Sequence, residues 1–147
     1  MLKEPASILD CGNSGTAIRL LMGFLSSLDG FFVLHGDKYL ASRPMKRVAN
    51  PLREIGAIID GRYNGELSPI SVRGSKLEPF NYDSPIASAQ VKSALILAGL
   101  RGKGVSTLNE PTLSRDHTEK MLRGMGVDIV SNGTKVTLTP TQKPLKP

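Results

Sequence analysis

SGTAIRLLMGFLSSL at residues 14–28 and ASAQVKSALILAGL at residues 87–100 are two stretches of the same helical character. Both consist almost entirely of apolar and small residues, and a glycine follows each of them within a few positions. The stretches 30–34 and 104–108 then begin with that glycine and carry β-branched or aromatic residues, which favour a strand. Such a repeated order within one chain predicts an internal duplication.

A Ser-Arg pair follows each repeated stretch, as Ser42-Arg43 in the first half and Ser114-Arg115 in the second. We expect each pair to open a second helix, with Pro44 in the first helical turn, where a proline is tolerated. These helices should end at Gly56 and Gly126, because glycine adopts the left-handed conformation that stops a helix.

Hairpins are expected to close each unit, and Asn132-Gly133 is a type I′ turn signal. Short extended stretches at 7–9 and 80–82 add a first strand to each half. The sequence therefore predicts an α/β (α+β) fold of two tandem βαβαββ units, approximately residues 7–74 and 78–140. Such units need each other, or a third copy, to cover the faces of their helices.

The composition limits the classes of function. A net charge of +6 and a pI near 9.7 attract anions, either phosphorylated metabolites or nucleic acid. Nucleic acid is disfavoured because the basic residues are dispersed and aromatics make up only 5% of the chain. No apolar run reaches the ~20 residues of a membrane span, so we expect a cytoplasmic protein without membrane contact. A single cysteine, Cys11, and two histidines predict no disulfide and no metal site.

The segment 10–16, DCGNSGT, lies between a predicted strand and a predicted helix. Its glycines would let backbone amides reach an anion at the positive end of that helix. The pattern fits equally well a helix start that is capped by Asn13 or Ser14, with Gly12 and Gly15 serving only a tight turn. It is neither a P-loop nor a dinucleotide fingerprint.

Arg43 and Arg115 occupy equivalent places in the two units, so both guanidinium groups could converge on one anionic ligand. Ser88-Ala89-Gln90 opens the helix of the second unit with a hydroxyl, amides and a carboxamide that can bind oxygens. Helix capping by Ser88 is the alternative interpretation. The isolated Arg43 is also compatible with an ordinary exposed arginine.

Asp116 and Glu119 have the spacing of a capping box, which makes this start of a helix mainly structural. His117 between them is interpreted as a surface or packed residue, not a proton carrier. Cys11 is interpreted as a small packed side chain, not a nucleophile.

Five segments resemble a known family in order and spacing: LDCGNSGTAIR at 9–19, GD at 36–37, SRPM at 42–45, SAQVKSA at 88–94 and SRDHTEKM at 114–121. They resemble the EPSP synthases, and the last two resemble the bacterial branch called class II. The resemblance implies two domains of three βαβαββ units each, an inside-out α/β barrel, with a cleft between them. Residues 1–147 would be a partial N-terminal domain.

The resemblance also implies a reaction. The enolpyruvyl group of phosphoenolpyruvate moves to the 5-hydroxyl of shikimate 3-phosphate and phosphate is released, with no metal and no organic cofactor. The acid–base groups of the family lie outside the matched segments, so the isolated chain is expected to carry part of the wall that binds these small anionic substrates and to show no turnover. Its other partner would be the remainder of the two-domain enzyme.

Site residues follow from the same resemblance. It assigns phosphoenolpyruvate to Gly15, Arg43 and Gln90, and shikimate 3-phosphate to Ser88, Ala89, Gln90 and Arg115, with Asn13, Thr16 and Arg19 shaping the glycine loop. Two alternatives stay open: a fragment of the related transferase acting on UDP-N-acetylglucosamine, and a non-catalytic anion- or RNA-binding module.

Overall fold

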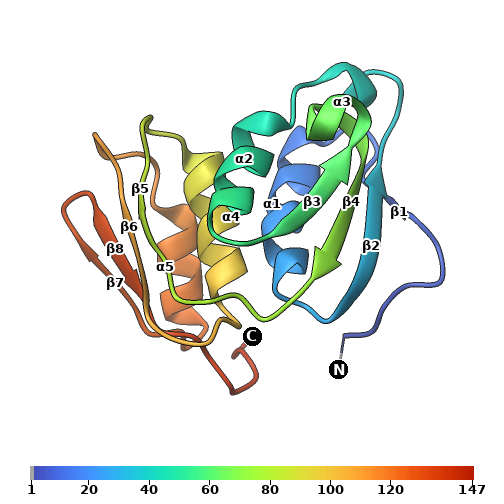
Figure 1. Cartoon of the computed structure of the whole chain (residues 1–147). Coiled ribbons are helices and arrows are strands. Elements are labelled where there is room, and N and C mark those ends of the chain that lie inside the picture. The colour runs from blue at the N-terminus through green and yellow to red at the C-terminus, as the bar shows by residue number, and fades with distance from the viewer. Residues whose placement is uncertain (1) are drawn as a thin grey trace.

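The computed structural model describes residues 2–147, and they fold into two similar halves (Figure 1). The first half contains β1 (Leu9–Asp10), α1 (Gly15–Ser26), β2 (Gly30–His35), the 3-10 turn η1 (Leu40–Ser42), α2 (Lys46–Glu54), β3 (Ile58–Gly61), α3 (Arg62–Gly65) and β4 (Leu67–Gly74). The second half contains β5 (Asn81–Asp83), α4 (Ala89–Gly99), β6 (Ser106–Asn109), α5 (His117–Gly124), β7 (Ile129–Asn132) and β8 (Lys135–Leu138).

The two halves have the same sheet topology. One sheet has the strand order β1-β2-β4-β3 and the other β5-β6-β8-β7, so corresponding strands occupy corresponding places. In each sheet the first pair is parallel and the remaining pairs are antiparallel. The predicted mixed α/β fold with two duplicated units is confirmed.

Helices α1, α2, α4 and α5 lie between the two sheets, whereas the short α3 lies at the end of the first sheet beside β3 and β4 (Figure 1). Helix α4 is buried along almost its whole length, including residues 91–96. A helix that is apolar on all sides belongs in the interior, which agrees with the uniform composition of this stretch. The sheets turn one face toward the helices, and along β4 buried Ile70 and Val72 alternate with more exposed neighbours.

Helices α1 and α4 approach each other at Gly23. A Cβ atom built on Gly23 would stand 2.1 Å from the carbonyl oxygen of Ala94. Only a residue without a side chain allows this contact between the two halves. The core is therefore continuous across the duplication.

The ends of the helices partly agree with the expectations. Gly56 and Gly126 have φ values of 103° and 93°, which confirms the predicted left-handed helix stops. The prediction that the Ser-Arg pairs open helices is wrong. Helix α2 begins at Lys46 and α5 at His117. Arg43 is extended, with φ −85° and ψ 137°, because the residue before a proline is driven out of the helical region.

The second hairpin uses a different turn from the one predicted. Asn132 pairs with Lys135, which leaves Gly133 and Thr134 as the central residues. Gly133 has a φ of 61°, whereas Thr134 is not among the residues with positive φ. Positive φ at the first central residue alone is the pattern of a type II′ turn, so the type I′ prediction is wrong. In the first half, β3 and β4 are joined by α3, where Tyr63 and Asn64 are left-handed.

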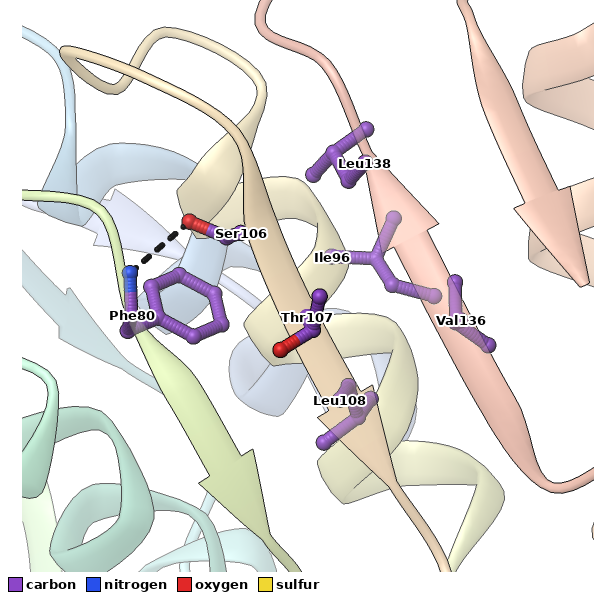
Figure 2. A pocket seen from close by; sticks show the side chains of 7 residues that line it. All are labelled: Phe80, Ile96, Ser106, Thr107, Leu108, Val136 and Leu138. Carbon is purple, nitrogen blue, oxygen red and sulfur yellow. Dashed lines mark hydrogen bonds between the residues drawn. The ribbon is translucent and has the colours of Figure 1, made fainter.

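The gap seen in Figure 2 belongs to the core, not to a binding site. It lies between α4 and the second sheet, and its apolar lining includes Ile96, Leu108 and Val136. Its volume is about 10 Å³, whereas ligand pockets usually measure about 300–1,000 Å³. Among residues 2–147, the longest helix is α1 with 12 residues, and none is long and apolar enough to cross a bilayer.

Candidate anion-binding site

The glycine-rich loop before α1 is held by its own side chains. Asp10 Oδ1 accepts a hydrogen bond from the amide of Gly12 at 2.8 Å, and Gly12 has a positive φ of 59°. Ser14 Oγ accepts from the amide of Ala17 at 3.0 Å, so Ser14 is the helix cap and Asn13 is not. The next amides, on Gly15 and Thr16, have no intrahelical acceptor at a helix start. Capping and anion binding are therefore compatible here.

Two arginine side chains converge on Gly15. A Cβ atom at this position would stand 3.1 Å from Arg43 Nη1 and 3.2 Å from Arg19 Nη1. Arg43 arrives from the extended segment before α2, and Arg19 lies one turn further along α1. The bare glycine backbone thus faces two guanidinium groups at the positive end of a helix.

Arg19 joins the two halves of the molecule at this point. Its Nη1 donates to Gln90 Oε1 at 3.0 Å, and its Nη2 donates to the carbonyl of Pro44 at 2.9 Å. Gln90 Nε2 in turn donates to Thr16 Oγ1 at 3.3 Å. The structure therefore brings together Gly15, Thr16, Arg19, Arg43 and Gln90, which the sequence singled out in separate segments.

The cluster carries excess positive charge. Burial, together with the neighbouring charges of Arg47 and Arg43, lowers the pKa of Arg19 from its ordinary value. Within residues 2–147, no ion pair involves these three arginines. A bound anion would relieve this repulsion. Arg47, the second residue of α2, was missed by sequence reasoning.

The remaining predicted residues lie on the second half, apart from one. Ser88 caps α4, with its Oγ accepting from the amide of Val91 at 3.4 Å, and Ala89 is the first residue of that helix. Arg115 is exposed in the loop before α5, and it makes no side-chain hydrogen bond or ion pair within the described residues. Asn13 is exposed in the glycine loop of the first half. Convergence of Arg43 and Arg115 on one ligand stays a prediction.

A buried ionic cluster was not anticipated. Lys92 Nζ lies 3.2 Å from Glu110 Oε2 and 3.0 Å from Glu119 Oε2, and these side chains are only 1–2% exposed. The capping-box interpretation of Asp116 and Glu119 is therefore wrong. Asp116 makes no side-chain cap bond and pairs with Lys120 at 3.3 Å, while Glu119 points into the core. The sequence signal for this cluster was Lys92 itself, because a lysine inside an apolar, buried helix requires acidic partners in the core.

Cys11 is half-buried beside the glycine loop. Burial, and then the negative charge of Asp10, raises the pKa of its thiol. Because a nucleophilic cysteine needs the thiolate form, this environment supports the interpretation of Cys11 as a packed residue.

The duplicated βαβαββ fold is shared with solved structures of enolpyruvyl transferases. The enolpyruvyl transferase NikO from Streptomyces tendae superposes on 85% of this chain and 29% of its own, with a TM-score of 0.60 and 12% identity. That likeness concerns the fold alone. The model of the EPSP synthase (3-phosphoshikimate 1-carboxyvinyltransferase) family matches residues 1–147, and the chain belongs to this family.

Relatives within the family are much more similar. The 3-phosphoshikimate 1-carboxyvinyltransferase of a Nitratiruptor species is 60% identical over 151 residues, which cover 99% of this chain and 35% of the relative. That of Sulfurimonas denitrificans is 59% identical, covering 99% and 34%. The solved EPSP synthase from Acinetobacter baumannii is 46% identical with a TM-score of 0.91, covering 98% and 33%. The chain spans about a third of the length of these proteins.

Proposed function

We propose that this chain is part of the N-terminal domain of an EPSP synthase and forms one wall of its substrate cleft. The complete enzyme would transfer the enolpyruvyl group of phosphoenolpyruvate to the 5-hydroxyl of shikimate 3-phosphate and release phosphate. The observation that carries this proposal is the convergence of Arg19 and Arg43 on Gly15, with Gln90 bonded to Arg19 at 3.0 Å. An enzyme of the shikimate pathway, which leads to the aromatic amino acids, would work in the cytoplasm.

Each residue of the wall has a role that its chemistry supports. Arg43 would hold the carboxylate or phosphate of phosphoenolpyruvate through paired N–H donors, and Gly15 leaves room for that ligand. Gln90 lies on the seam between the two halves and would touch both substrates. At the start of α4, Ser88 and the amide of Ala89 would meet the phosphate of shikimate 3-phosphate, with Arg115 as its counter-ion.

These groups bind and orient, but the transfer also requires proton movement. The 5-hydroxyl loses its proton as its oxygen adds to the enolpyruvyl carbon and the methylene carbon gains a proton; phosphate then leaves with its C–O bond as the new methyl group loses a proton, so a base and an acid must act on the substrates. No residue of this wall is assigned that task. We therefore propose that the 147 residues alone bind the substrates without turnover.

Replacing Arg115 with alanine is expected to weaken the binding of shikimate 3-phosphate by about 10- to 100-fold. A hydrogen bond to a charged group contributes about 1.5–3 kcal/mol, and 1.4 kcal/mol corresponds to tenfold in affinity. The measurement is a titration of the ¹⁵N-labelled chain followed by NMR, with Gln90→Ala as a second variant.

The matched control is Arg101→Ala, which removes the same charge from an exposed arginine at the other end of α4. An equal loss in both variants would reduce the effect to net charge and count against the assigned pocket. Salt-dependent binding of an oligonucleotide, with no response to shikimate 3-phosphate, would favour an RNA-binding module instead.

A Gly15→Ala substitution is expected to impair phosphoenolpyruvate binding selectively. The new methyl group would lie 3.1 Å from Arg43 Nη1 and 3.2 Å from Arg19 Nη1, so both flexible side-chain ends must move slightly. The fold should persist, because Gly15 is not among the glycines with positive φ and an alanine there needs no strained backbone. In the same NMR titration, the shikimate 3-phosphate response at Ser88 and Arg115 serves as the internal control and should be unchanged.

A further inference from the structure

The loop between β6 and α5, residues 110–116, contacts a buried ammonium group, that of Lys92. Lys92 on α4 lies 3.2 Å from Glu110 and 3.0 Å from Glu119, and its Nζ donates to the carbonyl of Ser114 at 3.4 Å. Ser114 Oγ also donates to Glu110 Oε1 at 2.5 Å. We call these four residues, Lys92, Glu110, Ser114 and Glu119, the Lys92 cluster.

Three oxygen atoms surround the ammonium group of Lys92: the carbonyl of Ser114 accepts a hydrogen bond, and the carboxylates of Glu110 and Glu119 are ion-pair partners. Lysine has three N–H donors, and the three oxygen atoms around Lys92 come from the start of the loop, from its interior and from the helix that follows it. One side chain of α4 is therefore tied to the loop and its flanking helix at three points along the chain. Ser93, the next residue of α4, adds a hydrogen bond between its Oγ and Thr118 Oγ1 at 2.7 Å.

Stability alone does not account for such a cluster. Burying charges costs solvation free energy, and apolar residues of similar volume often stabilise a core as well or better. What a charged cluster adds is direction, because each N–H must point at its own acceptor. Here the two hydrogen bonds of the cluster, one from Lys92 to the Ser114 carbonyl and one from the Ser114 hydroxyl to Glu110, both involve the residue immediately before Arg115.

The position of Arg115 depends on this loop. Its side chain is exposed and makes no hydrogen bond or ion pair within residues 2–147, so only the backbone of residues 110–116 decides where it stands. Lys92 lies two residues after Gln90 on the same helix, and that helix starts at the Ser88 cap. The Lys92 cluster thus connects the helix that presents Ser88 and Gln90 to the loop that presents Arg115.

We propose that Lys92 is a positioning residue, which holds loop 110–116 in one conformation and so sets Arg115 opposite the start of α4. It touches no ligand and acts through Ser114. The identity of the anion that Arg115 meets rests on the proposed function, whereas the order of the loop does not. The test therefore needs one measurement without ligand and one with it.

The main variant is Lys92→Met/Glu110→Leu/Glu119→Leu, which replaces the buried charges by apolar groups and leaves none without a partner. Its fold should persist, as judged by unchanged amide shifts in the first half of the chain. Amide ¹⁵N relaxation should show residues 112–116 loosening, with order parameters falling from about 0.85 to below about 0.6. Shikimate 3-phosphate should bind about tenfold more weakly, while the phosphoenolpyruvate response at Gly15 and Arg43 is retained.

Ser114→Ala is the second variant, because it keeps every buried charge and removes only the hydroxyl that bonds to Glu110. It should loosen residues 112–116 to a smaller degree, and it decides the question if the triple variant does not fold. A loop as rigid as in the parent in the folded variants would overturn the proposal. Loosening without any ligand response in the parent chain would support the positioning role and contradict the proposed function instead.

Discussion

Replacing Lys92 alone with methionine is expected to destabilise the chain by about 3–5 kcal/mol, because it leaves two buried carboxylates without their cation. Glu110 and Glu119 are each only 2% exposed, so water cannot take the place of the ammonium group. Urea denaturation followed by circular dichroism measures the loss. Since the free energy of unfolding of a small domain is only about 5–15 kcal/mol, a change of this size would clearly lower the urea concentration at the unfolding midpoint.

The matched control is Lys103→Met. Lys103 pairs with Glu78 at the surface, where the two side chains are 48% and 72% exposed, and such pairs contribute about 0–1 kcal/mol. Both substitutions remove the same charge and the same ammonium group. Equal losses would mean that burial of the Lys92 cluster has no energetic consequence.

The second large effect is expected at Gly23. Alanine there should destabilise the chain by about 1–3 kcal/mol or more, because its methyl group would stand 2.1 Å from the backbone oxygen of Ala94. No side-chain rotation relieves a clash with backbone, so α1 and α4 must move apart. Thermal and urea denaturation of the variant measure the cost.

Gly124→Ala is the control for Gly23→Ala. Gly124 lies in α5, and a Cβ atom there would have nothing within 4 Å. Alanine is favoured over glycine by up to about 1 kcal/mol in a helix interior, and Gly124 is the last residue of α5, so this variant should be neutral or slightly more stable. If both substitutions shift stability in the same direction, helix propensity and not interhelical contact governs Gly23.

Much of the fold could be predicted because its signals are local. Ser14 and Ser88 cap their helices, and Gly56 and Gly126 stop theirs, through interactions within one turn of chain. The mistaken helix start at Ser42-Arg43 has a local cause as well, because Pro44 forces Arg43 into an extended conformation. The turn type was predicted wrongly because Asn132 is the last paired residue of β7, so that Gly133 and not Asn132 is the first central residue of the turn.

The site was less accessible to sequence reasoning. Gly15, Arg43 and Gln90 were singled out through family resemblance, but the hydrogen bond that ties Gln90 to Arg19 had no local signal. Glu119 was assigned to a helix cap because its spacing from Asp116 fits one, and spacing does not reveal which side of a helix is buried. Arg47 was missed because nothing in its local sequence places α2 beside Arg19.

The duplication, the class of fold and the residue types of an anion site were readable from the amino-acid sequence. These follow from periodicity, caps and motifs, which depend on residues close together in the chain. Tertiary packing was needed to bond Arg19 to Gln90, 71 positions away, and to bring Lys92 to Glu110 and Glu119 in the core. The way the two halves pack determines which groups meet a buried charge. The packing of α1 on α4 depends on both helices together, so the sequence of either helix alone does not specify it.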